Sequence, residues 1–257
     1  ASRLESLGVE VALGDVADSD SLDLACRDID TVYHIAAMYR TAGQRDSVYR
    51  DVNVGGTKKL LEAAQAAGVR RFVHCSTGGV HGDIKSPPAT EDAPLSPGDI
   101  YQSTKLEAEK LARDFGLQSD LEVVIARPMA IYGPGDTRFL KMFRGIANRR
   151  FPILGSGTIF YHLTYIDDLV EGLRLCGEIS RAVGRTYLLA GPSYTTLNEL
   201  ISVIADEFQV PPPTLHLPVW PFWMAGAVCE AISIPFGLEP PLYRRRVDFF
   251  TKSRAFD

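Results

Sequence analysis

A tyrosine and a lysine four residues apart form the pair whose spacing most clearly suggests chemistry. Tyr101 and Lys105 lie in the segment YQSTK, within a predicted helix from Ser96 to Gly116, so both side chains project from one face. A free phenol has a pKa of about 10, and a nearby ammonium favours its phenolate form. Such a tyrosine could exchange a proton with an alcohol or ketone oxygen. The alternative is a pair of solvated surface side chains.

Two hydroxyl side chains precede this pair at the end of a predicted strand. Ser76 and Thr77 follow the β-rich run from Arg70, and the carboxyl ends of parallel strands are where doubly wound sheets bind ligands. A hydroxyl there could hydrogen-bond the substrate oxygen while Tyr101 moves the proton. Glycines can let the backbone approach a ligand closely, and this segment also contains Gly78, Gly79 and Gly82. A serine-rich turn without a ligand is the competing interpretation.

An alternation of short strands and longer helices must position these side chains. The predicted strands are residues 9–13, 31–36, 70–76 and 121–128, and the predicted helices between them are residues 19–27, 47–67 and 96–116. Gly68 is expected to close the second helix, while Ser96 and Pro97 are expected to start the third and Gly116 to end it. This rhythm is typical of a parallel sheet flanked by helices.

The pattern becomes less regular beyond about residue 133. Residues 138–148, 166–176 and 197–208 are predicted to be helical, with Thr195 or Thr196 leading the last helix, and residues 186–190 are predicted to be extended. Asp167 and Asp168 lie at the start of a predicted helix, where their negative charges stabilise the helix by interacting with its dipole. We expect these elements to form a smaller lobe that binds the substrate.

Composition narrows the possible functions. The 257 residues are 46% hydrophobic and 23% charged, which suits one globular unit with a large core and excludes disorder and coiled coil. The net charge is −5, and the local basic run Arg244 to Arg246 is short, so no nucleic-acid partner is expected.

No metal site and no export or membrane segment is expected. The four cysteines are spaced unlike zinc ligands and are interpreted as buried thiols of a cytoplasmic protein: Cys26, Cys75, Cys176 and Cys229. The segment ASRLESLG lacks the features of an export signal. A spanning helix is a poor fit because the longest apolar stretch, Leu215 to Leu238, is interrupted by Pro218, Pro221, Glu230 and Pro235.

Several motifs occur together in a fixed order along the chain. They are GDVAD (14–18), HIAA (34–37), NVGGT (53–57), RRFVHCSTGGVHG (70–82), YQSTK (101–105), ARPMAIYGPGD (126–136) and HLTYIDDL (162–169). This series resembles the extended short-chain dehydrogenases/reductases, the group that contains the NAD-dependent epimerase/dehydratase family. The resemblance covers about residues 8 to 175 and rests on the order and spacing of the motifs.

The resemblance implies a role for each matching residue. Tyr101 would be the catalytic acid/base, Lys105 would lower its pKa and bond the nicotinamide ribose, Thr77 would bind the substrate oxygen, and Asn53 would belong to the active-site helix. The cofactor would be NAD or NADP. Its remaining contacts would be Asp15, Val16, Ile35, Ala36, Ala37, Ser76, Pro128 and Ile131.

The resemblance also implies the fold. We expect an α/β protein with a Rossmann-like doubly wound parallel sheet, incomplete at its N-terminal edge, and a smaller C-terminal α+β lobe. Residues 1–132 would form a partial cofactor-binding domain, with interleaved returns after residue 160, and residues 133–257 would form mainly the substrate lobe. A homodimer through the helices near Asn53 and Tyr101 is expected.

Simple readings of individual residues agree with these roles at several points. The Asp15 carboxylate could accept a hydrogen bond from an exocyclic amine, or it could cap a turn. Gly55 and Gly56 lie inside a predicted helix, where each glycine costs about 1 kcal/mol relative to alanine, so a close approach by cofactor or sheet is expected. His34 and His162 are interpreted as structural, hydrogen-bonded histidines.

The chain departs from the family pattern in places that bear on cofactor and substrate. The family's Gly-rich strand–turn–helix does not precede Ala1, so we expect poor dinucleotide binding and little activity from this chain alone. Dehydratases carry an Asp-Glu pair where Gly78 and Gly79 stand, which disfavours sugar dehydration. Epimerases commonly place an asparagine at the position of Ala130 and an arginine at that of Tyr161.

Three functions remain open from the sequence. The first is an oxidoreductase that interconverts a secondary alcohol and a ketone. A less charged substrate is favoured by the absence of the epimerase asparagine and arginine at Ala130 and Tyr161 and by the apolar segment Leu217 to Val228. This segment could equally be a helix that covers the core. The second is a nucleotide-sugar epimerase that uses the same hydride step. The third is a non-catalytic dinucleotide sensor, which the intact Tyr, Lys and Thr set argues against.

Overall fold

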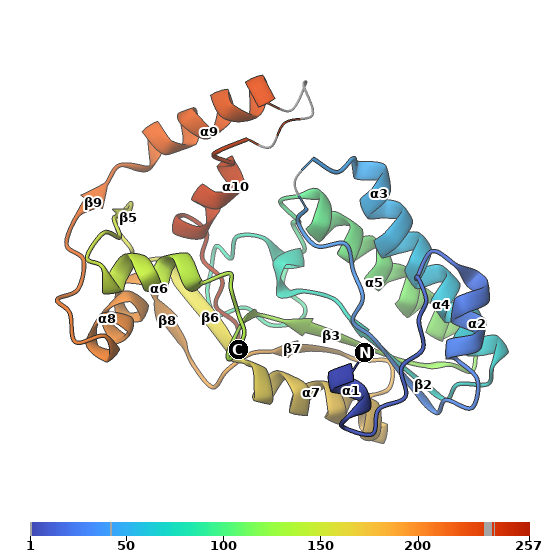
Figure 1. Ribbon diagram of the computed structural model, residues 1–257. Helices are drawn as coiled ribbons and strands as arrows, with labels where there is room; N and C mark the ends of the chain where they lie inside the picture. The colour runs from blue at the N-terminus through green and yellow to red at the C-terminus, as the bar shows by residue number, and fades with distance from the viewer. Residues whose placement is uncertain (1, 42, 234–237, 239) are drawn as a thin grey trace.

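The protein is described here by a computed structural model that covers residues 2–41, 43–233, 238 and 240–257 (Figure 1). Pro235, one of the residues expected to interrupt the apolar stretch, lies outside the described residues. Among the described helices, none is both long enough and apolar enough to cross a membrane.

A parallel sheet forms the centre of the molecule. Its described strands run in the order β1 (Thr31–His34), β2 (Arg71–Cys75), β3 (Glu122–Pro128) and β7 (Thr186–Leu189), and each neighbouring pair is parallel. Helices cover both faces, so β2 and β3 are buried almost throughout, including the polar residues Arg71, His74 and Arg127. The predicted α/β class with a parallel sheet is confirmed.

The strand predicted at residues 9–13 is wrong. These residues form an irregular connection after α1 (Ser2–Glu5), and Val9 N donates to Leu4 O at 3.2 Å. A strand exists only where a neighbour accepts its backbone hydrogen bonds, and no described residue pairs with this segment. The predicted strand 31–36 also ends earlier, at His34.

The helix predicted at residues 47–67 forms as one continuous run with a wide turn inside it. It consists of α3 (Asp46–Arg50), the π-helical turn η1 (Asp51–Gly55) and α4 (Gly56–Ala66). Gly68, with φ +74°, closes it as predicted. A Cβ on Gly56 would lie 3.0 Å from Val16 Cγ2, so the expected close approach is made by the chain segment before α2 (Ser19–Ala25).

The helix that carries Tyr101 begins and ends later than predicted. Its bounds are Ile100–Gln118 (α5), and its N-cap is Asp99, whose carboxylate accepts from Gln102 N at 2.8 Å. The helix continues through Gly116, where the close approach of β3 favours a glycine, since a Cβ on this residue would lie 2.8 Å from Val123 Cγ2. The predicted start at Ser96 and Pro97 and the predicted end at Gly116 are therefore wrong.

Two helical layers enclose the sheet. The helices α2, α4 and α5 lie over one face, and α7 (Ile166–Glu178) lies under the other (Figure 1). Asp167 and Asp168 occupy the first turn of α7, as expected. The core on the α4 and α5 side includes Leu60, Leu61, Phe72, Val123 and Ile125, and the core on the α7 side includes Val73, Val124, Leu169 and Leu173.

The remaining elements gather at the other side of the molecule (Figure 1). β4 (Ala130–Tyr132), β6 (Phe160–Tyr165) and β8 (Tyr194–Thr196) form one small sheet, and β5 (Ile153–Leu154) pairs with β9 (His216–Leu217). α6 (Leu140–Ala147) and α8 (Leu197–Glu207) pack on each other, and a capping box at Thr196 starts α8.

Short helical segments are η2 (Gly78–His81), η3 (Ser180–Ala182), α10 (Arg244–Val247) and η5 (Asp248–Phe250).

The apolar segment predicted from residue 217 onward forms α9 (Val219–Ser233), which lies at the edge of the molecule (Figure 1). Trp220 is 71% exposed and Trp223 is 44% exposed, so the helix does not cover a core as its simplest interpretation supposed. Arg244 pairs with Glu230 and lies over the ring of Trp223, which ties α10 to α9.

Candidate active site

The candidate site lies at the carboxyl end of β2, where the chain leaves the sheet and α5 begins. Tyr101 stands in the first turn of α5, half-buried, and its phenol hydroxyl makes no hydrogen bond within the described part of the chain. Burial raises the pKa of Tyr101; Cys75 and Tyr39 add to this effect, and the Arg40 cation opposes it. The pKa of Tyr101 is thus raised, and the expected lowering of this pKa by Lys105 stays a prediction.

Lys105 lies one turn further along α5 and is enclosed by the protein. Its side chain belongs to the core with 1% exposure, and no described residue forms a hydrogen bond or ion pair with its ammonium. Burial lowers the pKa of Lys105 to about 8, although Cys75 and Glu109 oppose the shift. A buried cation without a partner is costly, so a site with this residue is prepared for a polar ligand.

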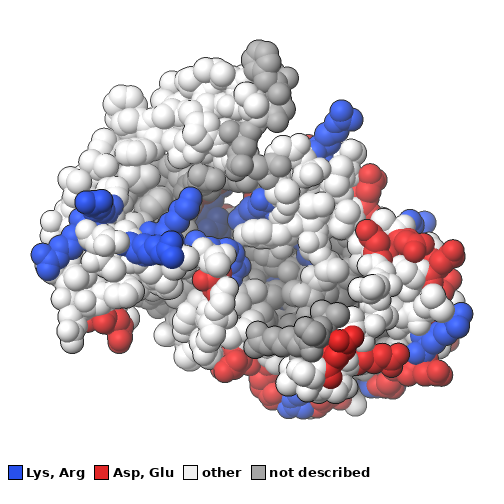
Figure 2. Space-filling model, viewed as in Figure 1, with Lys and Arg blue, Asp and Glu red and all other residues white. Residues whose placement is uncertain are grey.

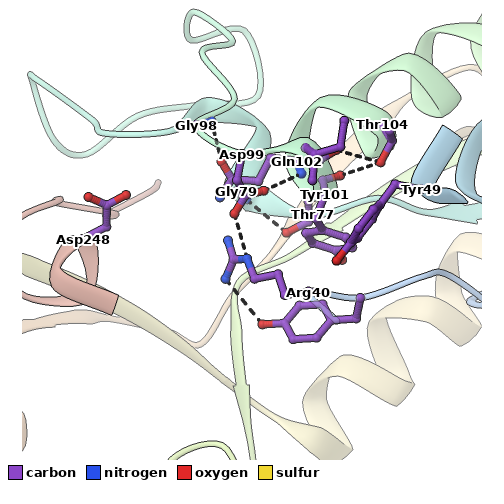
Figure 3. A network of polar contacts seen from close by, with 12 residues as sticks. Arg40, Tyr49, Thr77, Gly79, Gly98, Asp99, Tyr101, Gln102, Thr104 and Asp248 are labelled. Carbon is purple, nitrogen blue, oxygen red and sulfur yellow. Dashed lines mark hydrogen bonds and ion pairs between the residues drawn. The ribbon is translucent and has the colours of Figure 1, made fainter. Parts of the chain in front are cut away.

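The hydroxyl groups of Ser76 and Thr77 make different contacts. Thr77 caps η2, where its hydroxyl oxygen accepts from Gly79 N at 3.1 Å and keeps its own proton available to a ligand (Figure 3). The Ser76 hydroxyl instead donates to Glu109 Oε2 at 2.8 Å within the core. Thr77 therefore remains in contact with the site, and the Ser76 side chain supports it from behind.

A buried ionic network lies behind Ser76. Arg127 from β3 makes two bonds to Glu109, with Nη2 to Oε1 at 2.6 Å and Nε to Oε2 at 3.1 Å, and its Nη1 lies 2.9 Å from His81 Nε2. Burial raises the pKa of Glu109, but the bonds from Arg127 and Ser76 outweigh this effect and hold the pKa below its usual value. The network joins α5, β3 and η2, the elements that carry the site.

The side-chain amide of Asn53 forms hydrogen bonds that connect two elements of the site. Its Oδ1 accepts from Met38 N at 2.7 Å, and its Nδ2 donates to Met38 O at 3.2 Å and to Thr104 Oγ1 at 2.9 Å. The wide turn η1 presents this amide between the segment after β1 and the helix that carries Tyr101. The structure thus places Asn53 at the site, as a residue that holds two of its elements together.

Residues that sequence reasoning missed cover the phenol of Tyr101. The Tyr39 ring meets the Tyr101 ring edge-on, and the Arg40 guanidinium carbon lies 5.7 Å from the Tyr101 ring centroid. Arg40 Nε donates to Asp99 Oδ2 at 2.8 Å, which joins the segment after β1 to the N-cap of α5 (Figure 3). From the sequence, only the helix-capping tendency of Asp99 could have indicated that this residue lies at the start of α5.

The predicted cofactor-binding residues fall into two groups. Ile35 is 57% exposed, and Ala36 and Ala37 continue the same edge after β1, where apolar side chains face outward. Pro128 and Ile131 lie at the end of β3 and in β4, in the part of the site nearest the smaller lobe.

The predicted adenine contacts lie before α2. Asp15 is exposed, and its Oδ1 accepts from Ala17 N at 2.8 Å, so it caps a turn; its expected contact with the cofactor stays a prediction. Val16 packs against Gly56 at the start of α4. The predicted structural histidines are hydrogen-bonded: His34 lies 2.9 Å from Thr57 Oγ1, and His162 lies 2.8 Å from Gly191 O.

The two glycines after Thr77 lie against neighbouring side chains, which would have to move if either glycine carried a side chain. A Cβ on Gly78 would collide with the Met129 side chain and lie 3.3 Å from Pro128 O, and a Cβ on Gly79 would lie 2.9 Å from Gln102 Nε2. No group of His, Cys, Asp or Glu side chains suited to hold a metal occurs among the described residues.

Two relatives with assigned names match nearly the whole of this chain. N-acetyl-alpha-D-glucosaminyl-diphospho-ditrans,octacis-undecaprenol 4-epimerase of Escherichia coli O157:H7 is 29% identical over 249 residues, 95% of this chain and 75% of that protein. Sterol demethylase protein B of Methylococcus capsulatus is 32% identical over 253 residues, 95% of this chain and 72% of that protein. Across the relatives compared, the chain spans from 48% to 75% of their length.

Solved structures share the fold. The crystal structure of gox2253 superposes with a TM-score of 0.80 at 27% identity, covering 100% of this chain and 78% of that one. UDP-glucuronic acid 4-epimerase from Bacillus cereus, solved in complex with NAD, gives a TM-score of 0.73 at 27% identity over 84% of this chain and 73% of that one. The sequence profile of the NAD-dependent epimerase/dehydratase family matches residues 1–190, and this protein belongs to that family.

Proposed function

We propose that the protein transfers a hydride between a secondary alcohol or ketone and NAD or NADP, with Tyr101 as the proton donor and acceptor. The observation that most supports this function is the buried, unpaired ammonium of Lys105, one helical turn from the unpaired phenol of Tyr101. Both groups lie at the carboxyl edge of a parallel sheet, where doubly wound folds bind their ligands.

The residues present fit a dinucleotide. The Lys105 ammonium lacks the partner that a ribose hydroxyl would provide, and the exposed apolar edge after β1 offers a surface to the adenosine half. We assign Lys105, Asp15, Val16, Ile35, Ala36 and Ala37 to cofactor binding, with Pro128 and Ile131 at the nicotinamide end. When bound, the cofactor supplies or accepts the hydride.

The chain's own residues manage the proton and the substrate oxygen. Thr77 would donate its hydroxyl proton to the substrate oxygen, since its own oxygen already accepts from Gly79 N. Tyr101 would give its phenolic proton to that oxygen during reduction and take it back during oxidation. Lys105 favours the phenolate in the second case, and Asn53 joins η1 to α5, the helix that carries both Tyr101 and Lys105.

An epimerase is the second candidate because several relatives carry that name. The Escherichia coli relative and a Vibrio cholerae relative named UDP-glucose 4-epimerase are each 29% identical to this chain. An epimerase would use the same side chains, remove a hydride from the sugar and return it to the other face.

We also propose that the protein forms a homodimer and that the chain divides at about residue 132 into a cofactor-binding part and a substrate-binding part.

The test is a panel of secondary alcohols, ketones and nucleotide sugars offered to the full chain with each cofactor, followed by absorbance at about 340 nm and product analysis. An oxidoreductase gives a stoichiometric absorbance change that Tyr101→Phe abolishes and that the matched Tyr194→Phe leaves intact. Inversion of a sugar without net absorbance change identifies the epimerase. Equal turnover by wild type and Tyr101→Phe would overturn both proposals.

A further inference from the structure

The helix α9 turns its apolar side chains away from the rest of the protein. Its large exposed side chains recur at helical spacing and therefore share one side of the helix, which we call the α9 face. They are Trp220, Trp223, Met224, Val228 and Ile232. Surface helices are usually arranged the other way, with the apolar side toward the core. A continuous exposed apolar surface of this kind marks an interaction site.

The opposite side of α9 carries its polar residues and binds α10. Gly226 and Ser233 are buried there. Glu230 accepts two hydrogen bonds from Arg244, from the backbone N at 2.7 Å and from Nε at 2.6 Å. A Cβ on Gly226 would lie 3.0 Å from Arg244 N, so the two helices approach closely at this point. These contacts fix the rotation of α9 about its axis and hold the α9 face outward.

The helix is too short to cross a membrane, but its composition suits the membrane surface. It has 15 residues, which at about 1.5 Å each reach roughly 22 Å, whereas the hydrocarbon core is roughly 30 Å thick. Residues 208–229 contain no Asp, Glu, Lys or Arg. Tryptophan is enriched at the boundary between headgroups and acyl chains. These features suit a helix that lies parallel to the membrane plane.

Unpaired cations lie beside the α9 face. Residues 137–166 contain no Asp or Glu. The exposed basic residues of this segment that form no ion pair with any described residue are Lys141, Arg144, Arg149 and Arg150. The ladder between β5 and β9 pairs Ile153 with His216, so the chain just after α6 and the chain just before α9 lie side by side.

The distribution of charge over the surface shows the same arrangement. In Figure 2, Lys and Arg side chains gather in the region of α6, next to the uncharged surface of α9, and most of the visible Asp and Glu side chains lie over the opposite part. The molecule as a whole carries −5, so this local excess of cations does not follow from its composition.

These charges distinguish two possible partners for the α9 face. Two copies of the chain joined through this face by a two-fold axis would bring the same unpaired cations near each other, which is unfavourable. A membrane with anionic lipids attracts them instead, and each Lys or Arg near such a surface strengthens binding about fivefold. The charge pattern therefore favours a lipid surface over a second copy.

We propose that α9 lies in the surface of a membrane that contains anionic lipids, with the α9 face among the acyl chains. The cations of α6 and of the segment after it would then contact the lipid phosphates. Binding of this kind grows with the apolar area that is buried and with the attraction to anionic lipids. The inference does not depend on the proposed function, because none of these residues belongs to the site of Tyr101.

Tryptophan fluorescence measures this interaction directly, because both tryptophans of the chain, Trp220 and Trp223, lie on α9. The full chain is titrated with vesicles of phosphatidylcholine alone and with mixed vesicles of phosphatidylglycerol and phosphatidylcholine in equal parts. We expect the mixed vesicles to shift the emission to shorter wavelength and to carry the protein upward in a density gradient. They should bind more tightly than phosphatidylcholine alone at low salt, and about 1 M salt should reduce the difference.

Matched variants test the two parts of the surface. Met224→Glu places a charge on the α9 face and should weaken binding at least about tenfold, whereas Val170→Glu places the same charge at an exposed apolar position of α7 and should bind as wild type does. The double variant Arg149→Ala and Arg150→Ala should bind mixed vesicles about 25-fold more weakly. Arg181→Ala, at an exposed arginine of η3, is its control.

Several results would contradict the inference. They are the absence of flotation and of an emission shift with both kinds of vesicle, equal binding by wild type and Met224→Glu, and equal binding to the two lipid compositions at low salt. A dimer that Met224→Glu dissociates, in a protein that binds no vesicles, would assign the α9 face to a second copy and overturn the lipid proposal.

Two further measurements keep these outcomes separate. Thermal unfolding checks that each variant is folded, and Val228→Glu, one turn further along the α9 face, replaces Met224→Glu if that variant is not. Tyr101→Phe is expected to bind vesicles as wild type does while losing turnover. Vesicle binding in a protein without turnover therefore supports this inference even where the proposed function fails.

Discussion

The ring of Tyr101 meets the ring of Tyr39 edge-on, with centroids 4.9 Å apart and planes at 77°. Arg40 lies against both rings, 5.6 Å and 5.7 Å from their centroids, and is held by Asp99. Tyr39 and Arg40, which follow β1, therefore cover the phenol of Tyr101 at the start of α5, about sixty residues later in the chain. The acidity of Tyr101 depends on this cover.

Removing the cover is expected to make Tyr101 a stronger acid. Burial is the largest cause that raises the pKa of Tyr101, so Tyr39→Ala, which admits water to the phenol, lowers that pKa. Oxidation of an alcohol needs the phenolate, and the pH of half-maximal oxidation should fall with it. The pH profile of kcat/KM measures the shift. Tyr194→Ala, at an exposed tyrosine of β8, is the control, and identical profiles for wild type and Tyr39→Ala would contradict the expectation.

Lys105→Met is expected to stabilise the protein while removing its activity. The pKa of Lys105 falls from 10.5 to about 8, so holding its charge in the core costs about 3 kcal/mol at roughly 1.4 kcal/mol per unit. Methionine fills a similar volume without that charge. Urea unfolding at pH 7 should show a higher free energy of unfolding for the variant, by about 2 to 3 kcal/mol.

The pH dependence of this difference follows from the same pKa. Below about pH 8 Lys105 is charged in both the folded and the unfolded chain, so the folded protein carries the full cost. Between about pH 8 and 10.5 the unfolded chain binds more protons than the folded one, and wild-type stability rises with pH. The advantage of Lys105→Met should therefore shrink across this range. A constant difference from pH 7 to pH 10.5 would refute the assignment.

Glu109→Gln is expected to destabilise the protein far more than a matched surface change. Glu109 is 1% exposed and is bonded by Arg127 and Ser76, so its removal leaves a buried guanidinium without its anion and costs about 3 to 5 kcal/mol. Glu107→Gln, two residues earlier on α5, removes an exposed partner of Arg50 and should cost less than about 1 kcal/mol. Chemical denaturation at pH 7 compares the two.

The Glu109 network should also set part of the acid sensitivity. Because the folded pKa of Glu109 lies below the usual 4.5, its contribution is fully present above that pH and is lost as the pH falls through the folded value. The gap between wild type and Glu109→Gln is therefore expected to narrow below about pH 4.5. A gap that stays the same down to pH 3 would show that the network does not titrate as described.

Asp99 has two tasks that substitutions can separate. Asp99→Asn keeps an oxygen that can cap α5 through Gln102 N and removes the negative charge that holds Arg40, whereas Asp99→Ala removes both. The alanine variant should lose about 0.5 to 2 kcal/mol of stability, and the asparagine variant should stay close to wild type. Thermal denaturation measures this, and equal losses in both variants would show that the ion pair, and not the cap, carries the stability.

Local patterns were sufficient to predict the elements whose cause is local. The spacing of Tyr101 and Lys105 on one helix face depends only on helical periodicity, and the closure at Gly68 depends only on a left-handed residue. The start of α5 was mispredicted because Ser96 and Asp99 are both good caps three residues apart. The choice between them is made by Gly98 and Asp99, which both bond to Gln102.

Features with a distant cause could not be predicted from the sequence. Residues 9–13 have a strand-like pattern, but a strand also needs a neighbour that no local pattern reveals. The path of Tyr39 and Arg40 is set by long-range bonds, since Thr41 is held by the hydroxyl of Tyr49 and Met38 by Asn53. Ser253, Arg254 and Phe256 bond to β6 from a distant part of the chain, and residue spacing does not reveal these contacts.

The parallel pairing of β3 with β7 has a consequence for how the chain is made. β3 ends at Pro128 and β7 begins at Thr186, so the ribosome must release the whole segment from β4 to α7 before the fourth strand can dock. Until then β3 presents an open edge of unpaired amides and carbonyls, flanked by valine and isoleucine, that neighbouring nascent chains could join. Truncations between these strands should accumulate as aggregates, and chaperone demand should peak during synthesis of that interval.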